Sequence, residues 1–126
     1  MDDNRVWACE KSLWMGDAEH YRTLIDGDCL MVLPVKPHIL GGEEAVNTVS
    51  DTPRWSDVKI SGGRIARPQE GMIVIAYTAH ATRQDEEAYV AHCTSTYRRL
   101  DHDDWRAVQH QQTPPLRVTT DSPSAS

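Results

Sequence analysis

The chain has 126 residues, 39% of them hydrophobic and 25% charged, and its formal net charge at pH 7 is −6. This composition is that of a globular protein, and the length is enough for one domain with its own core but not for two. Because acidic residues outnumber basic ones and no basic patch occurs, we do not expect the protein to bind nucleic acid. No apolar run approaches a membrane span and the N-terminus carries no targeting pattern, so we expect no membrane partner and a cytoplasmic location.

The three cysteines, Cys9, Cys29 and Cys93, are far apart and set among apolar neighbours. We interpret them as small buried thiols in a reducing compartment, not as a disulfide framework. Neither a CxxC nor an HExxH spacing occurs, and we therefore expect no metal and no cofactor.

Helical patterns dominate the first part of the chain. Apolar residues at helical spacing, Val6, Trp7, Cys9, Leu13 and Trp14, predict a first helix that ends at Gly16. Asp17 then caps a second helix, which we expect to end at Gly27. Residues 29–33 predict a short buried strand stopped by Pro34. After a Gly-Gly break, the acidic pair Glu43-Glu44 favours the start of a third helix.

From Trp55 onward the apolar residues alternate as in strands. Residues 55–66, 72–83, 88–100 and 105–113 predict four strands joined by polar turns of hairpin length, which is an antiparallel meander. Gly62-Gly63 within the first of these strands indicates a bulge or bend. Residues 115–126 lack apolar groups to bury, so we predict a single domain over 1–114 and a disordered tail over 115–126.

The order of these elements resembles the nuclear transport factor 2-like superfamily over about residues 5–114. The resemblance rests on the Asp28–Pro34 strand followed by Gly-Glu-Glu-Ala, on Trp55 after a proline, and on the closing Tyr-x-Arg-Arg, Trp-Arg and His-Gln-Gln-Thr-Pro motifs. More narrowly the chain is similar to the SnoaL-like branch, near the association domain of calcium/calmodulin-dependent kinase II.

The resemblance implies an α+β fold in which N-terminal helices pack on a strongly curved antiparallel sheet, forming a cone with an internal pocket. It also implies a homodimer through the outer face of the sheet. Ketosteroid isomerase members of the superfamily carry a proton-shuttling Asp immediately before the proline of the first strand. Leu33 stands at this position, and an aliphatic group cannot move a proton.

The alternation along residues 72–83 sorts their side chains onto two faces, and we expect Ile73, Ile75, Tyr77, Ala79 and Ala81 to point inward. Symmetric hairpins would place Tyr77 opposite Ser95, and Ser95 opposite His110. The candidate pocket residues are Trp14, Tyr21, Trp55, Tyr77, Ser95, Tyr97 and His110. His110 is the candidate catalytic residue, because an imidazole near hydroxyl groups can act as a general acid or base, although a purely structural role in the core is the alternative.

His80 and His92 fall on neighbouring strands, but two imidazoles without a third ligand do not make a recognisable metal site. The first functional hypothesis is a domain that binds a small, largely apolar molecule, with no assigned reaction. The second is a SnoaL-like isomerase, cyclase or dehydratase that uses His110 with a Tyr and water. The third is an oligomerising interaction module without catalysis.

Overall fold

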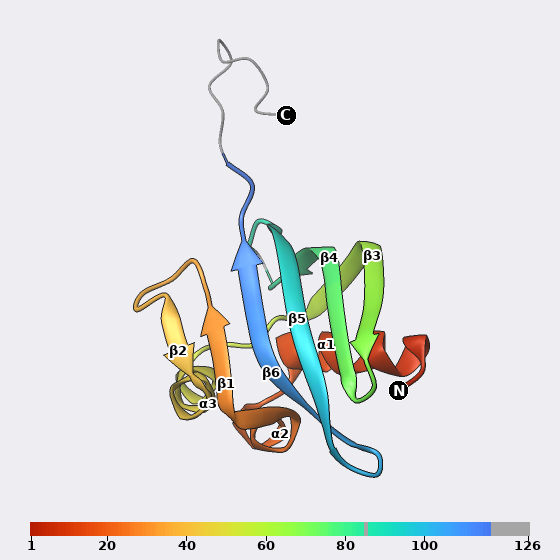
Figure 1. Ribbon diagram of the computed structural model, residues 1–126. Helices are drawn as coiled ribbons and strands as arrows, with labels where there is room; N and C mark the ends of the chain where they lie inside the picture. The colour runs from red at the N-terminus through yellow and green to blue at the C-terminus, as the bar shows by residue number, and fades with distance from the viewer. Residues whose placement is uncertain (85, 117–126) are drawn as a thin grey trace.

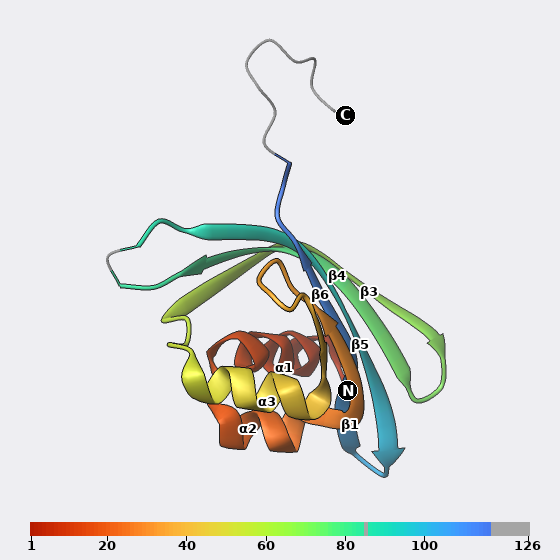
Figure 2. The same ribbon diagram turned by 90° about the vertical axis from the view of Figure 1, so that its left-hand side faces the viewer.

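The computed structural model describes residues 1–84 and 86–116 (Figure 1). Within them the helices are α1 (Asp3–Met15), α2 (Ala18–Leu24) and α3 (Gly42–Asp51). The strands are β1 (Ile25–Val32), β2 (Ile39–Gly41), β3 (Asp57–Gln69), β4 (Met72–Thr82), β5 (Tyr89–Asp101) and β6 (Asp104–Thr113). The helices cover one face of a single sheet, which makes the chain an α+β protein (Figure 2). No helix in this part of the chain is long and apolar enough to cross a membrane.

The six strands are ordered β2-β1-β6-β5-β4-β3. Strands β3 to β6 pair antiparallel with their neighbours in sequence, which confirms the predicted meander. The sheet as a whole is mixed, not antiparallel as expected, because β1 lies parallel to β6. A parallel pair needs a long crossover connection, and residues 33–103 supply it. The sheet also stays open, with β2 and β3 at its edges, and does not form a strongly curved cone.

The helix boundaries follow local capping. The Asp17 side chain accepts a hydrogen bond from the backbone N–H of His20 at 2.9 Å, so Asp17 is the predicted cap of α2. This helix ends at Leu24 and not at Gly27, because Ile25 already pairs with Ala107 of β6. Helix α3 begins after Gly41, whose backbone N–H donates to the Glu44 carboxylate at 3.0 Å.

The predicted inner face of β4 is confirmed, but its register with β5 is not as predicted. The expected inward set of β4 is buried, and Ser95 pairs with His110. Tyr77, however, lies opposite Cys93 instead of Ser95. The β4–β5 ladder ends at Ala81 and Tyr89, so the connection is longer than the four-residue turn that we expected. A shift of two residues keeps each side chain on its face, and Tyr77 still points inward.

Strand β3 contains the expected irregularity, since its register with β4 shifts between Ser61 and Arg64, at the Gly62-Gly63 pair. This strand continues to Gln69 and so runs past the predicted end at Ala66. Most of the tail predicted to be disordered, residues 117–126, lies outside the described residues.

Candidate functional site

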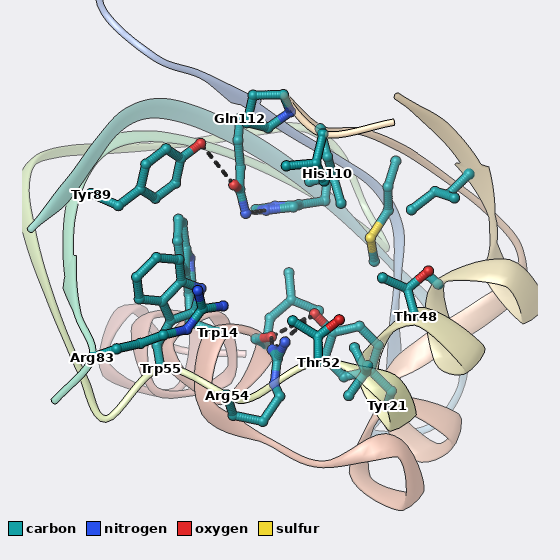
Figure 3. A pocket seen from close by; sticks show the side chains of 18 residues that line it. Trp14, Tyr21, Thr48, Thr52, Arg54, Trp55, Arg83, Tyr89, His110 and Gln112 are labelled. Carbon is teal, nitrogen blue, oxygen red and sulfur yellow. Dashed lines mark hydrogen bonds between the residues drawn. The ribbon is translucent and has the colours of Figure 1, made fainter. Parts of the chain in front are cut away.

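A cavity of about 320 Å³ opens between the helices and the inner face of the sheet (Figure 3). Its apolar wall comes from Leu13 and Trp14 of α1, from β1 and β2, from α3, and from Trp55 before β3. Its polar lining residues are Tyr21, Thr48, Thr52, Arg54, Arg83, Tyr89, His110 and Gln112. A concave, mainly apolar space with a few polar groups is the usual form of a small-molecule site.

The structure separates the predicted pocket residues into two groups. Trp14, Tyr21, Trp55 and His110 line the cavity. Tyr77, Ser95 and Tyr97 do not line it, but lie buried behind His110 and against α1. The second group makes its hydrogen bonds to a residue that the sequence reasoning missed.

That residue is Glu10 of α1, whose side chain is 0% exposed. Its carboxylate accepts hydrogen bonds from the hydroxyls of Tyr77, Ser95 (2.6 Å) and Tyr97 (2.7 Å). Glu10 lies on the buried helix stripe together with Val6, Leu13 and Trp14. An acidic residue in the middle of an apolar stripe is the signal that could have revealed it, because Glu is almost never fully buried unless it is paired.

His110 of β6 joins this buried acid to the cavity. Its Nδ1 lies 2.7 Å from Ser95 Oγ and 3.3 Å from Glu10 Oε2. Because the Ser95 hydroxyl donates to the carboxylate, its oxygen accepts from the imidazole, which places a proton on Nδ1. The ring is therefore fixed in orientation by Ser95 and Glu10, and its second nitrogen remains for other partners.

The second nitrogen, Nε2, lies 3.1 Å from the side-chain amide nitrogen of Gln112. The Gln112 carbonyl accepts from the Tyr89 hydroxyl at 3.1 Å, as the dashed line in Figure 3 shows. With this orientation of the amide, its N–H donates to Nε2, and the imidazole is the neutral Nδ1–H tautomer. The polar groups thus form one chain of hydrogen bonds, from Tyr89 at the cavity wall to Glu10 in the core.

The electrostatics of this chain favour an ionised Glu10. Burial raises the pKa of Glu10, but hydrogen bonds from His110, Ser95 and Tyr77 outweigh burial and leave the pKa below its ordinary value. Burial and the nearby Glu10 carboxylate raise the pKa values of Tyr77 and Tyr97, so both phenols remain protonated donors. Tyr77 also accepts from the Trp14 indole N–H at 2.9 Å, which ties the cavity wall to the same network.

Aromatic rings and two arginines form the remaining polar side of the cavity. Trp55 and Tyr89 stack with ring centroids 5.4 Å apart, and the Arg83 guanidinium lies 3.8 Å from the Trp55 ring centroid. Arg54 donates to the backbone carbonyls of Gly16 (2.8 Å) and Leu13 (2.7 Å). Arg54 therefore connects the end of α1 to the segment before β3.

Leu33 lies at the cavity wall, as an apolar residue. The aspartates nearest to it in the sequence have other roles: Asp26 accepts from the backbone N–H of Asp28 at 2.9 Å and pairs with Arg98 at 2.7 Å. The carboxylate closest to the imidazole comes instead from Glu10 of α1.

The histidines of the outer face do not contribute to this site. His92 Nδ1 lies 3.0 Å from Thr78 Oγ1, and His80 pairs with Val90 and not with His92. In residues 1–84 and 86–116, no three His, Cys, Asp or Glu side chains are grouped closely enough to hold a metal ion. Cys29 and Cys93 are buried and Cys9 is half-buried.

No family model matches this sequence, and no curated protein shows significant similarity to it. Solved structures do match. A nuclear transport factor 2-like protein from Cytophaga hutchinsonii is 17% identical over 91% of this chain and 100% of that chain, with a TM-score of 0.73. A candidate ketosteroid isomerase from Parabacteroides distasonis is 18% identical over 87% of this chain and 85% of that chain, with a TM-score of 0.74. The association domain of calcium/calmodulin-dependent kinase II from C. elegans is 14% identical over 87% and 90% of the two chains, with a TM-score of 0.68. The chain therefore has the nuclear transport factor 2-like fold.

Proposed function

We propose that this protein binds a small, largely apolar molecule in the cavity between the helices and the sheet. The observation that carries the proposal is a preformed cavity of about 320 Å³ with a mainly apolar wall and one oriented imidazole, His110, in its lining. An apolar body is favoured by the hydrophobic effect, at roughly 25 cal/mol for each Å² removed from water. The SnoaL-like character expected from the sequence agrees with such a pocket, which lies between the helices and the inner face of the sheet.

The polar end of the ligand is set by His110 and Gln112. The imidazole Nε2 is an acceptor that already has an amide partner at 3.1 Å, and the Gln112 amide is held by Tyr89. A ligand hydroxyl could take the place of the Gln112 N–H at Nε2, or donate to the Gln112 carbonyl. Because Ser95 and Glu10 fix the ring from behind, this acceptor keeps its direction whether or not a ligand is bound.

Binding can be tested with N-phenylnaphthylamine, a neutral fluorescent probe of apolar cavities. We expect a blue-shifted, saturable signal with the natural chain and its loss in Ala45→Phe, which fills the cavity from α3. Ala66→Phe, at an exposed position of β3, is the matched control and should bind as the natural chain does. Equal binding by both variants would contradict the proposal, provided that their unfolding curves are alike.

The buried carboxylate favours a second candidate function, proton transfer at His110. A neutral imidazole with a carboxylate behind its Nδ1 can accept a proton at Nε2, because the resulting cation would be stabilised by Glu10. This is the chemistry that a SnoaL-like isomerase, cyclase or dehydratase would need, with Tyr89 or a bound water as a further donor. It does not depend on an acid at Leu33.

Proton transfer can be tested without knowing the substrate, by the base-catalysed ring opening of nitrobenzisoxazole. We expect His110→Gln to reduce the rate to that of the solvent, and Glu10→Gln to reduce it partly. His102→Gln, at an exposed turn, should have no effect. A rate that is unchanged in His110→Gln would exclude this residue as the base.

The third candidate function is assembly. We propose that the protein forms a homodimer through the outer face of the sheet, where Leu30 is 59% exposed and Ile39 is 66% exposed. Exposed apolar residues that cluster on one face are typical of protein interfaces. The pocket lies on the other face, so assembly and binding are compatible in one molecule.

A further inference from the structure

The cavity is lined by positively charged side chains, although the protein as a whole has a net charge of −6. Among its lining residues within the described part of the chain, two are arginines and none is an aspartate or a glutamate. Glu10 is near the cavity but does not line it, because it lies behind His110. There its carboxylate accepts hydrogen bonds from three hydroxyls and lies next to the imidazole. The side of the cavity formed by Arg54 and Arg83 is therefore positively charged. A neutral apolar ligand would give these two guanidinium groups no negative partner.

Arg54 provides a fixed positive charge. Its guanidinium donates to the carbonyls of Leu13 and Gly16 and to the Tyr21 hydroxyl at 3.3 Å, all of them neutral acceptors. Within residues 1–84 and 86–116, Arg54 has no carboxylate within ion-pair distance. A half-buried guanidinium without a counter-charge raises the affinity of the adjacent space for an anion, because the pair is less screened than at the surface.

Arg83 provides a group that can be rearranged. It is stacked on Trp55, and its ion pair with the exposed Glu86 is long, at 3.9 Å. The Arg83 Nε atom is buried and has no hydrogen-bond partner among the described residues. Leaving a buried donor unpaired costs free energy, so a rotation of the Arg83 side chain that brings this N–H to an acceptor in the cavity is favoured. Figure 3 shows Arg54 and Arg83 across the cavity from His110 and Gln112.

We propose that the ligand is a small amphiphilic carboxylic acid, whose carboxylate is bound by Arg83 in the positive field of Arg54, with its apolar body against Trp14 and the aliphatic wall. A planar guanidinium can donate two parallel hydrogen bonds to the two oxygens of a carboxylate. Stacking on the Trp55 ring fixes the orientation of the Arg83 guanidinium plane. The inference rests on the proposed binding function and names the class of ligand for the same cavity. His110 and Gln112 then meet a hydroxyl at the opposite end of the ligand.

The test uses a panel of alkyl and aryl carboxylic acids of graded length, each with its primary amide, measured by calorimetry. The amide keeps the shape and removes only the negative charge. We expect acids to bind the natural chain roughly tenfold or more tightly than their amides, since hydrogen bonds between charged groups are stronger than neutral ones. Arg83→Gln should reduce this preference several-fold, to what the field of Arg54 alone provides, while amide affinity is unchanged. Arg22→Gln removes the same charge from an exposed site on α2 and should keep the preference.

A second variant does not depend on removing a cavity residue. Glu86→Gln eliminates the competing carboxylate of Arg83, and we expect it to increase acid affinity several-fold without changing amide affinity. Equal binding of acids and amides by the natural chain would overturn the inference while the binding function stands. A preference that is unchanged in both Arg83→Gln and Glu86→Gln would also overturn it. If neither the panel nor N-phenylnaphthylamine binds, the proposed function itself fails.

Discussion

Glu10 and His110 come from opposite ends of the chain, yet Glu10 Oε2 lies 3.3 Å from His110 Nδ1, with the Ser95 hydroxyl bonded to both. Helix α1 thus places a carboxylate against the last strand of the sheet. Stability and the orientation of the cavity imidazole depend on the same contact. A change at Glu10 is therefore expected to affect the fold and the cavity together.

Glu10→Gln should lower the free energy of unfolding by about 3 kcal/mol. A carboxamide offers one acceptor oxygen, whereas the carboxylate accepts from Tyr77, Ser95 and Tyr97 on both oxygens. At least one buried hydroxyl would lose its partner. Urea unfolding measures the change, and Glu19→Gln, at an exposed position of α2, is the control with an expected effect within about 0.5 kcal/mol. If the two variants unfold alike, the buried network does not stabilise the fold.

The stability of the natural chain should fall in acid because of the same carboxylate. The pKa of Glu10 is lowered in the folded protein, so its stabilisation is complete above the ordinary glutamate pKa of about 4.3 and is lost as pH falls through the folded-state value. Unfolding in urea at pH steps below about 6 measures the slope. Glu10→Gln should show a flatter dependence than the natural chain. Some slope should remain, because the pKa of Asp26 is also lowered, by the backbone N–H of Asp28 and then by Arg98.

The hydrogen bonds also predict the protonation of His110. At neutral pH the ring should be the Nδ1–H tautomer, since Ser95 Oγ accepts from Nδ1 and the Gln112 amide donates to Nε2. Nitrogen chemical shifts of the labelled imidazole distinguish the tautomers. In Ser95→Ala stability should fall by about 1 kcal/mol, while the tautomer should persist because Glu10 Oε2 lies 3.3 Å from Nδ1. An Nε2–H tautomer in the natural chain would refute the assignment of the chain of hydrogen bonds.

Much of the fold could be predicted from the sequence, because alternation fixes the face of each strand side chain even when the register is wrong. Tyr77 pairs with Cys93, two residues from its predicted partner Ser95, yet Tyr77 still lies inside. The site was less predictable. The strand pattern predicts that His110 points inward, whereas the burial of Glu10 is not expected, because a charged residue in a helix usually faces solvent. The burial of Glu10 becomes favourable only when α1 packs against β4, β5 and β6, which carry its hydrogen-bond partners.

The close packing of α3 against β1 predicts a steric effect at Gly42. A Cβ atom at Gly42 would lie 2.8 Å from the Asp26 carbonyl oxygen and 3.0 Å from that of Gly27, and backbone atoms cannot move aside cheaply. Gly42→Ala should therefore destabilise the fold by about 1–3 kcal/mol in urea unfolding. Gly27→Ala is the matched control, because a Cβ atom there meets nothing within 4 Å. A loss in Gly27→Ala as large as that in Gly42→Ala would contradict this explanation.

The proposed dimer predicts a specific effect of charge on the outer face of the sheet. Val32 and Ile39 are cross-strand partners on β1 and β2, are 41% and 66% exposed, and adjoin Leu30 on the same strip. Placing glutamates at both Val32 and Ile39 would bury two charges in an interface formed there, which costs several kcal/mol. We expect light scattering to give a dimer mass for the natural chain and a monomer mass for the double variant. Leu100→Glu, at an exposed apolar site near the β5–β6 turn, should remain dimeric. A monomeric natural chain would exclude the dimer and, with it, assembly as a function of this domain.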